Sequence, residues 1–299
     1  MKANILYYIY LGVFKTLAHI PYWGLYAISD FLYLIVYKLA GYRVKTTRTN
    51  LKNSFPEKSE QEILDIERKF YKHFCDLIVE TIKLAHISDK EAAEHIKVTN
   101  PELPESISRQ GQSIILLLGH YCNWEYVTYI NFACKEHEKG GQVYRPQHDE
   151  AMDRLLLKLR SRFGNENVAQ IHTFRRLLEW RRDYPKFMIG FISDQRPNSE
   201  NLHNWTEFLN QDTAYAVGGE EIARRVGSKL LYLEMNKVAR GKYEITFKDI
   251  VPDSDLEGEK YPYTLQYMRM FEQTIRNAPQ YWLWTHKRWR YQRGNTKWH

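Results

Sequence analysis

The sequence predicts an α/β fold in which a buried sheet is flanked by helices and preceded by an apolar helical segment. Uninterrupted apolar runs between turn residues, at 114–118 and 187–192, are typical of strands buried on both faces of a sheet. Longer segments such as 59–82 carry apolar residues at helical spacing instead. The chain has 299 residues, of which 43% are hydrophobic, and is long enough for one large α/β domain or two small ones.

Residues 3–40 form a strongly apolar segment, which Pro21 divides in two. Neither half is an unbroken apolar span of about 20 residues. Three arrangements fit this pattern: one tilted membrane span, a broken helix pair lying in the membrane interface, or a soluble buried helix pair. Basic residues without an acidic one among them follow at once: Arg43, Lys45, Arg48 and Lys52. We predict a membrane anchor at 1–42 and, because basic residues tend to stay inside, a cytoplasmic domain at 43–299.

Capping and turn residues divide the rest of the chain into helices and strands. Ser59 and Glu62 form a capping box that opens the helix at 59–82. Pro101 and Pro104 mark a linker into the first buried strand. Strands are predicted at 114–118, 142–144, 168–171, 187–192, 230–235 and 243–247. Further helices are predicted after Asn123, at 149–163, after Thr173, within 216–227 and at 260–278. A long polar loop, suited to a lid, is expected at 196–212.

The strand at 114–118 leads into Gly119, His120, Asn123 and Glu125. On one continuous helix, residues five apart lie about 140° apart around the axis. His120 and Glu125 therefore meet only if His120 precedes the helix that Asn123 caps. A carboxylate bonded to one ring nitrogen fixes the tautomer and leaves the other nitrogen free to take a proton. This base and its orienting acid, without a protein nucleophile, suit activation of a substrate hydroxyl; the alternative is a helix cap with an incidental His and Glu.

Polar side chains also follow two other predicted strands. Arg145 follows the strand at 142–144, where a guanidinium suits a phosphate or carboxylate, although a surface salt bridge is the alternative. Asp194 and Gln195 follow the strand at 187–192 and can hold a substrate hydroxyl or position a basic neighbour; an ordinary Asx-turn is the alternative. Ligands of α/β sheets collect at such strand ends.

Charge and cysteine content narrow the function classes. The net charge of +7 indicates an anionic partner, which is a nucleic acid, an anionic lipid or a phosphorylated substrate. The three cysteines form no Cys-x-x-Cys pair, which fits a reducing compartment. The chain contains no His-Glu-x-x-His and no phosphate-binding Gly-rich motif, so we expect neither a metal nor an organic cofactor.

Five segments of the chain resemble one enzyme family. HYCNWE is similar to the His-x4-Asp/Glu signature of membrane glycerolipid-type acyltransferases. The wider chain resembles the late (secondary) lipid A acyltransferases of Gram-negative inner membranes, in the family's order and over nearly the whole length. The matching segments are YRVKTTRTNLKNSFP at 42–56, GHYCNWE at 119–125, VYRPQHDEAMDRLLLKLRSRFG at 143–164, ISDQRP at 192–197 and YWLWTHKRWR at 281–290.

The resemblance implies a glycerolipid-acyltransferase-like sheet, an acyl carrier protein thioester as donor and a hydroxyl of a phosphorylated lipid A precursor as acceptor. It implies an inner-membrane enzyme with its catalytic domain facing the cytoplasm. It places catalysis on His120 and Glu125, which makes Cys122 a spacer. Substrate binding is expected at Arg145, Asn123, Asp194, Gln195 and Arg288.

Other functions remain open at this point. The acceptor could instead be a lysophospholipid, an aminolipid or another glycolipid, because the basic residues are less diagnostic than the His–Glu pair. A membrane-tethered nucleic-acid-binding protein would also suit the positive charge and the aromatic tail. The sequence shows no RNA- or DNA-binding motif, however, so no nucleic-acid partner is expected.

Overall fold

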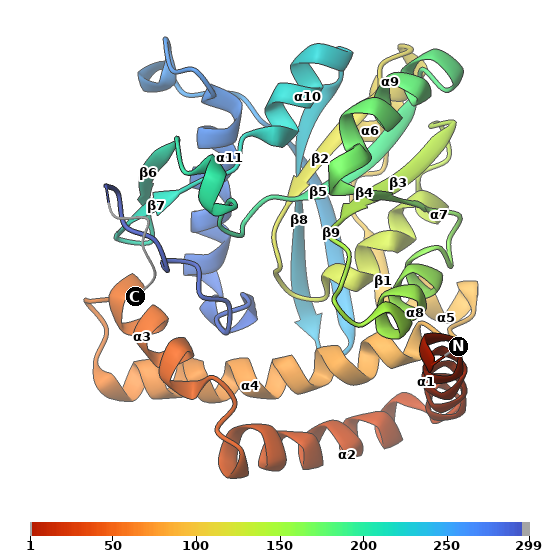
Figure 1. The fold of residues 1–299 in the computed structure, drawn as a ribbon, viewed down its shortest axis with the longest axis vertical. Coiled ribbons are helices and arrows are strands. Elements are labelled where there is room, and N and C mark those ends of the chain that lie inside the picture. Colours follow the sequence, from red (N-terminus) through yellow and green to blue (C-terminus); the bar gives the residue numbers. More distant parts are fainter. Residues whose placement is uncertain (1, 295–299) are drawn as a thin grey trace.

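The computed structural model describes residues 2–294, and within them one seven-stranded sheet is flanked by helices (Figure 1). The strands of this sheet are β1 (Ile96–Val98), β2 (Ile114–Leu118), β3 (Lys139–Tyr144), β4 (Glu166–Ala169), β5 (Phe187–Ile192), β8 (Lys229–Ala239) and β9 (Lys242–Asp249). Their order is β1-β9-β8-β2-β5-β3-β4. The predicted α/β class is confirmed, and so is each predicted strand within a few residues. The end of the predicted 43–299 domain, beyond residue 294, lies outside the described residues.

The centre of the sheet is parallel, because β2 pairs in parallel with β5 and β8, and β3 with β4 and β5. Every residue of β2 is buried, as its apolar run predicts. The β8–β9 hairpin is antiparallel, so β9 runs against the other central strands. The carboxyl ends of β2, β3 and β5 therefore meet at one edge of the sheet.

The helices pack around this sheet and below its lower end in Figure 1. They are α1 (Lys2–Ala18), α2 (Tyr22–Tyr33), α3 (Val44–Ser54), α4 (Glu60–Lys83), α5 (Asp89–His95), α6 (Glu102–Arg109), α7 (Ile130–Ala133), α8 (Glu150–Arg160), α9 (Thr173–Asp183), α10 (Gly218–Val226) and α11 (Pro262–Asn277). The capping box of Ser59 and Glu62 opens α4, as predicted. Helices α10 and α11 pack against the central strands β2 and β8, and α9 packs against β4.

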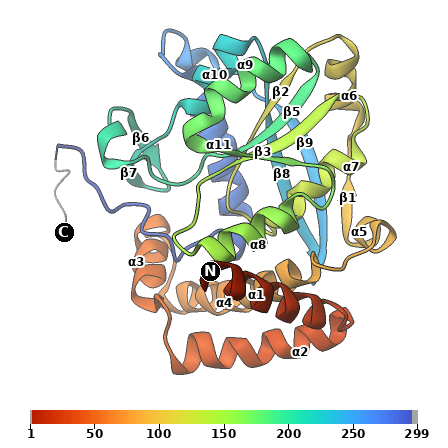
Figure 2. The ribbon, with the colours of Figure 1, turned by 45° about the vertical axis from the view of Figure 1, so that its right-hand side comes forward.

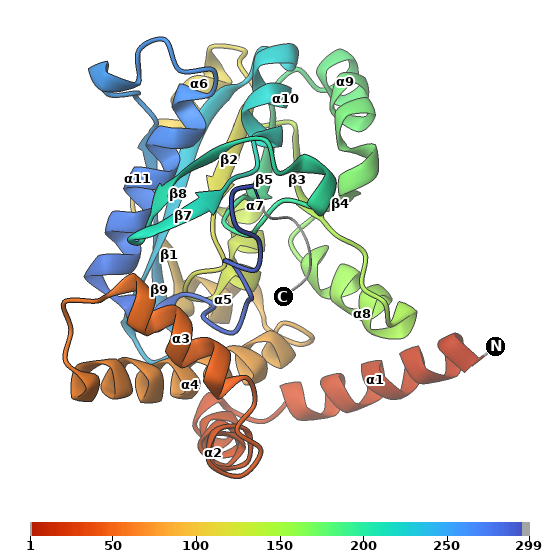
Figure 3. The ribbon, with the colours of Figure 1, turned by 60° about the vertical axis from the view of Figure 1, so that its left-hand side comes forward.

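The N-terminal helices gather at the lower end of the sheet. Helix α2 lies along α4, and α1 runs beneath α8 (Figures 2 and 3). Pro21 separates α1 from α2, and a π-helical turn (Leu34–Leu39) continues α2. Large apolar side chains on this segment stay exposed, Trp23 and Leu39 by about four fifths. Among residues 2–294, no single helix has the length and hydropathy of a membrane span, but Tyr22–Leu39 and Val44–Ser54, bent by 86°, pass that test together.

Two local predictions were wrong, and a third was right in position but not in helix type. The predicted polar loop at 196–212 contains a hairpin of β6 (Trp205–Phe208) and β7 (Gln211–Ala214). Its turn residues, Leu209 and Asn210, both have positive φ, which is the geometry of a tight hairpin turn. Leucine is an unusual residue there, and its side chain is fully buried, so tertiary packing overrides the local signal. The expected linker after Pro101 is the helix α6. The helix expected after Asn123 is a 3₁₀-helix (Trp124–Tyr129) followed by the single turn of α7.

Candidate active site

A cavity of about 990 Å³ opens where β2, β3 and β5 end. Its lining brings together polar residues from distant parts of the chain, namely His120, Glu125, Arg145, Arg160, Gln195 and Arg196. Such a crevice at the carboxyl ends of parallel strands is where α/β sheets place their ligands. The sequence prediction that His120, Glu125, Arg145 and Gln195 lie at one edge of the sheet agrees with this geometry.

The imidazole of His120 is held by a buried carboxylate. Nδ1 of His120 lies 2.8 Å from Oδ1 of Asp194, and the indole Nε1 of Trp282 donates to the other oxygen, Oδ2, at 2.8 Å. Burial alone raises the pKa of Asp194, but His120 and then Trp282 outweigh it, so that the pKa lies below its usual value. An ionised Asp194 accepts from Nδ1–H and leaves Nε2 of His120 without a proton, beside the amide of Gln195 at 3.4 Å.

Glu125 does not hold His120, which corrects the predicted pair. Its carboxylate accepts two hydrogen bonds from Arg160, from Nε at 2.8 Å and from Nη2 at 2.6 Å. Burial would raise the pKa of Glu125, but the charge and hydrogen bonds of Arg160 lower it, so this bidentate pair is ionic. Among residues 2–294, the ring nitrogens of His120 bond to Asp194 and Gln195 instead. Both Glu125 and Arg160 still line the cavity.

The chain turns between the strand and the 3₁₀-helix in residues 119–123, here called the motif loop. A Cβ on Gly119 would lie 2.1 Å from the ring of Phe271, so only glycine fits under that ring. Cys122 has a φ of +52°, which is uncommon for a residue with a side chain. Its thiol is fully buried, and burial raises the pKa of the thiol, so Cys122 is not an activated nucleophile.

Comparison with known proteins identifies the family of this chain. Residues 1–291 match the bacterial lipid A biosynthesis acyltransferases. The chain belongs to this family. It is also 23% identical over 282 residues to the lipid A biosynthesis lauroyltransferase of Escherichia coli (strain K12), an alignment that covers 94% of this chain and 90% of the relative. The resemblance seen in the sequence is thus confirmed, and the protein is an acyltransferase.

One residue of the acyltransferase that was predicted to bind substrate, Asn123, lies in the core instead. Asn123 is fully buried, and its side chain is used within the protein at both ends. Its Oδ1 accepts from the backbone N–H of Tyr126, as the predicted cap requires, and its Nδ2 donates to Oε2 of Glu80 at 2.7 Å. Asn123 therefore shapes the turn rather than meeting a substrate.

The two predicted arginines of the acyltransferase have different surroundings. Arg145 is exposed at the end of β3 and lines the cavity. Arg288 is buried, and its Nη2 donates to the carbonyl of Ala214 at 2.6 Å, so it anchors the C-terminal segment. Its Nε and Nη1 have no hydrogen-bond partner among residues 2–294. Burial lowers the pKa of Arg288 to about 10, although the charge of Asp194 acts to raise it.

Sequence reasoning missed two cavity residues. Arg160 counted only as part of a basic helix face, yet it pairs with Glu125. Arg196 directly follows the predicted Asp194 and Gln195, lines the cavity and lies over the ring of Tyr291. For Arg196 the signal was present, because it belongs to the same strand-end segment. No such signal was present for Arg160, because its partner Glu125 lies 35 residues away in the chain.

Proposed function

We propose that this acyltransferase transfers a fatty acyl chain from a thioester to a hydroxyl of a lipid A precursor, with His120 as the general base. The observation that carries the proposal is the His120–Asp194 hydrogen bond, which orients a proton-accepting Nε2 at the cavity. Nε2 takes the proton of the acceptor hydroxyl as its oxygen attacks the thioester carbonyl. The tetrahedral intermediate then breaks its C–S bond, and the imidazolium returns the proton to the leaving thiolate.

Three charged groups around the base complete the proposal. Asp194 stabilises the imidazolium through its hydrogen bond, the role that the sequence reading gave to Glu125. Glu125 contributes as a nearby fixed negative charge, and Arg160 holds it by the bidentate contact. Removing one member of such a buried pair leaves the other unpaired, so Glu125 and Arg160 act as a unit.

The acceptor and donor follow from the family and from the cavity. A lipid A-type acceptor carries phosphates, and Arg145 and Arg196, each with a guanidinium group, line the cavity. A guanidinium binds phosphate well. The relative in Escherichia coli is named a lauroyltransferase, which supports a saturated fatty acyl donor. We propose acyl carrier protein as its carrier, with the phosphopantetheine arm as part of the substrate.

The proposal includes a membrane location, because its acceptor is a lipid. Exposed apolar residues on α1 and α2, among them Ile9, Trp23 and Phe31, support an interfacial docking of residues 1–42. The site-bearing domain, from residue 43 onward, would then work at the inner face of the inner membrane. The basic residues Arg43, Lys45 and Arg48 at its start support that orientation.

The test is incubation with a mixture of acyl carrier protein thioesters and a bis-phosphorylated lipid A precursor, followed by mass spectrometry of the lipid. We expect one added acyl chain with wild type and a rate lower by about 10²–10⁴-fold with His120→Ala. His172→Ala is the matched control, because His172 is exposed and outside the cavity lining. Acylation of lysophospholipid in place of the lipid A precursor would contradict the acceptor, and a fully active His120→Ala would contradict the base.

A further inference from the structure

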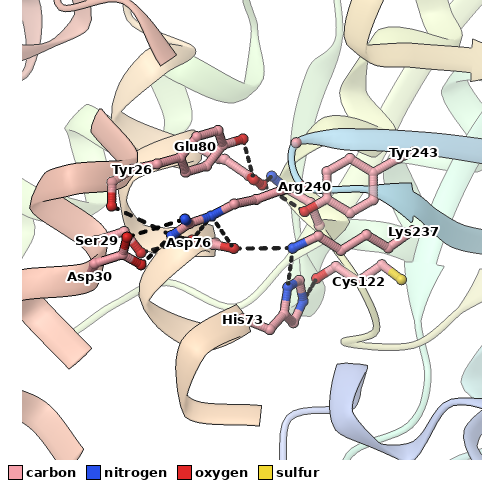
Figure 4. Close-up of polar contacts among 12 residues, drawn as sticks. Tyr26, Ser29, Asp30, His73, Asp76, Glu80, Cys122, Lys237, Arg240 and Tyr243 are labelled. Carbon is pink, nitrogen blue, oxygen red and sulfur yellow. Dashed lines mark hydrogen bonds and ion pairs between the residues drawn. The ribbon is translucent and has the colours of Figure 1, made fainter. Parts of the chain in front are cut away.

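A buried polar network contacts the motif loop at Cys122, and none of its residues labelled in Figure 4 lines the cavity. It joins α2, α4 and the β8–β9 hairpin, and its buried members include His73, Asp76, Glu80 and Lys237. Asp76 accepts from both Lys237 and Arg240. Buried ionic groups cost free energy to desolvate, so a network of this size needs a reason beyond core stability.

The network touches the motif loop at a strained residue. Nε2 of His73 lies 3.2 Å from the carbonyl oxygen of Cys122, the residue with φ of +52°. The backbone N–H of the same Cys122 donates to the carbonyl of Tyr281 at 3.0 Å. Both backbone polar groups of Cys122 are therefore held from outside the loop. A strained backbone conformation persists only where its surroundings over-determine it in this way.

Lys237 fixes the tautomer of His73. Its ammonium can only donate, and Nζ lies 3.3 Å from Nδ1 of His73, so Nδ1 must carry the lone pair. The ring proton is then on Nε2, aimed at the carbonyl of Cys122. Burial, followed by the charge of Lys237, lowers the pKa of His73 to about 3, so the ring stays neutral and keeps this tautomer at working pH.

We propose that His73 is a positioning residue of the acyltransferase. Lys237 sets the tautomer of His73, whose Nε2–H then holds the carbonyl of Cys122 and thereby keeps His120 in place. His120 lies two residues before Cys122 in the same loop, and its own carbonyl accepts from the backbone N–H of Leu283 at 3.1 Å. The C-terminal segment thus holds one side of the loop and His73 the other. His73 itself is buried and does not line the cavity.

The first readout is the exposure of Cys122 to a thiol reagent, which needs neither substrate nor turnover. All three cysteines, Cys75, Cys122 and Cys134, are free and buried, so each reports the opening of its own surroundings. His73→Phe keeps a ring of similar size but removes the donor. We expect alkylation of Cys122 in the folded protein, located by mass spectrometry of its peptides, to become roughly tenfold faster while Cys134 keeps its wild-type rate.

The second readout is the kinetic split, which rests on the proposed function. Misplacement of a general base lowers kcat without weakening substrate binding, so His73→Phe should lower kcat by about 10- to 100-fold with KM for donor and acceptor within about threefold. His73→Gln should restore both readouts, because its amide offers one donor to Cys122 and one acceptor to Lys237. Lys237→Met tests the tautomer in a chain that keeps the imidazole, and Asp76 stays paired with Arg240 there. We expect the same selective labelling of Cys122.

His137→Phe is the matched control, because it also removes a hydrogen-bonded imidazole, which here is half-buried and bonded to Asn131, away from the motif loop. It should leave the labelling of Cys122 and kcat at wild-type values. Equal labelling of all three cysteines in His73→Phe would show a general loss of stability and overturn the proposal. The proposal would also be overturned if Cys122 stayed as protected as in wild type in both His73→Phe and Lys237→Met. A variant with a lower kcat in which Cys122 is still protected would overturn it as well. Absence of acyl transfer by wild type would contradict the proposed function, whereas the labelling would still decide the brace.

Discussion

Replacing Asp194 by asparagine should reverse the tautomer of His120. Nε1 of Trp282 can only donate, so it selects the amide oxygen of the new side chain. The amide nitrogen then faces Nδ1 of His120 and donates to it. The ring proton moves to Nε2, where a general base needs a lone pair. The substitution thus blocks proton transfer while it preserves shape and nearly all contacts.

The expected loss in kcat is about 10²–10⁴-fold, the range for losing a positioned general base. This corresponds to about 3–5 kcal/mol of transition-state stabilisation. The assay is the thioester-dependent acylation of the lipid acceptor, with kcat and both KM values measured separately. KM should change little, because Asp194 is buried behind His120 and outside the cavity lining. The control is Asp183→Asn, an exposed carboxylate at the end of α9. A kcat for Asp194→Asn within threefold of wild type would refute the assigned role of Asp194.

Four further predictions concern two arginines, one histidine and the N-terminal helices. Arg145→Lys should raise KM for a bis-phosphorylated acceptor but not for its dephosphorylated form, and an equal acceptor preference in wild type and variant would contradict this. Arg288→Lys should instead lower the melting temperature, because Arg288 is buried. Burial, then Lys135, lowers the pKa of His137 to about 4, against about 6.5 when unfolded. Between these values the unfolded chain binds more protons than the folded one, so stability decreases as the pH is lowered through this window. His137→Gln should flatten this slope by about 1.4 kcal/mol per pH unit, measured by urea unfolding; an unchanged slope contradicts it. Replacing the exposed Trp23 and Phe31 by glutamate should weaken sedimentation with anionic vesicles but keep the thermal transition, and undiminished sedimentation would contradict docking through α2.

Hydrophobic pattern and capping residues were enough to predict most helices and every strand of the described sheet except the short edge strand β1, which was missed. The apolar runs predicted as strands match β2 and β5 residue for residue, because a strand that is buried on both faces is apolar along its whole length. The hairpin of β6 and β7 could not be predicted this way. Its turn places Leu209 at positive φ, and the gain from burying that side chain is a tertiary effect that no local pattern shows.

The residues His120 and Glu125 of the motif line the cavity, as predicted, but His120 bonds to Asp194 rather than to Glu125. Spacing along the chain favoured Glu125, five residues away, because a sequence displays only local neighbours. The positive φ of Cys122 turns the chain, and Glu125 ends against Arg160 on α8. A basic helix face at Arg160 carried no sign that one of its members would turn inward to a buried carboxylate.

The true pairing follows from strand order, which the sequence did not reveal. Strands β2 and β5 are parallel neighbours, and their register sets Leu118 opposite Ile192. The backbone N–H of Ser193 extends this register by donating to the carbonyl of Leu118 at 2.8 Å. His120 and Asp194 each lie two residues beyond that last pair, so they leave the same edge of the sheet side by side, although 74 residues separate them in the chain. Side chains at equal distances past paired residues of neighbouring parallel strands are brought together by the sheet itself. Once β5 is placed beside β2, Asp194 is therefore the carboxylate that reaches His120, and no property of the motif loop alone could have identified it.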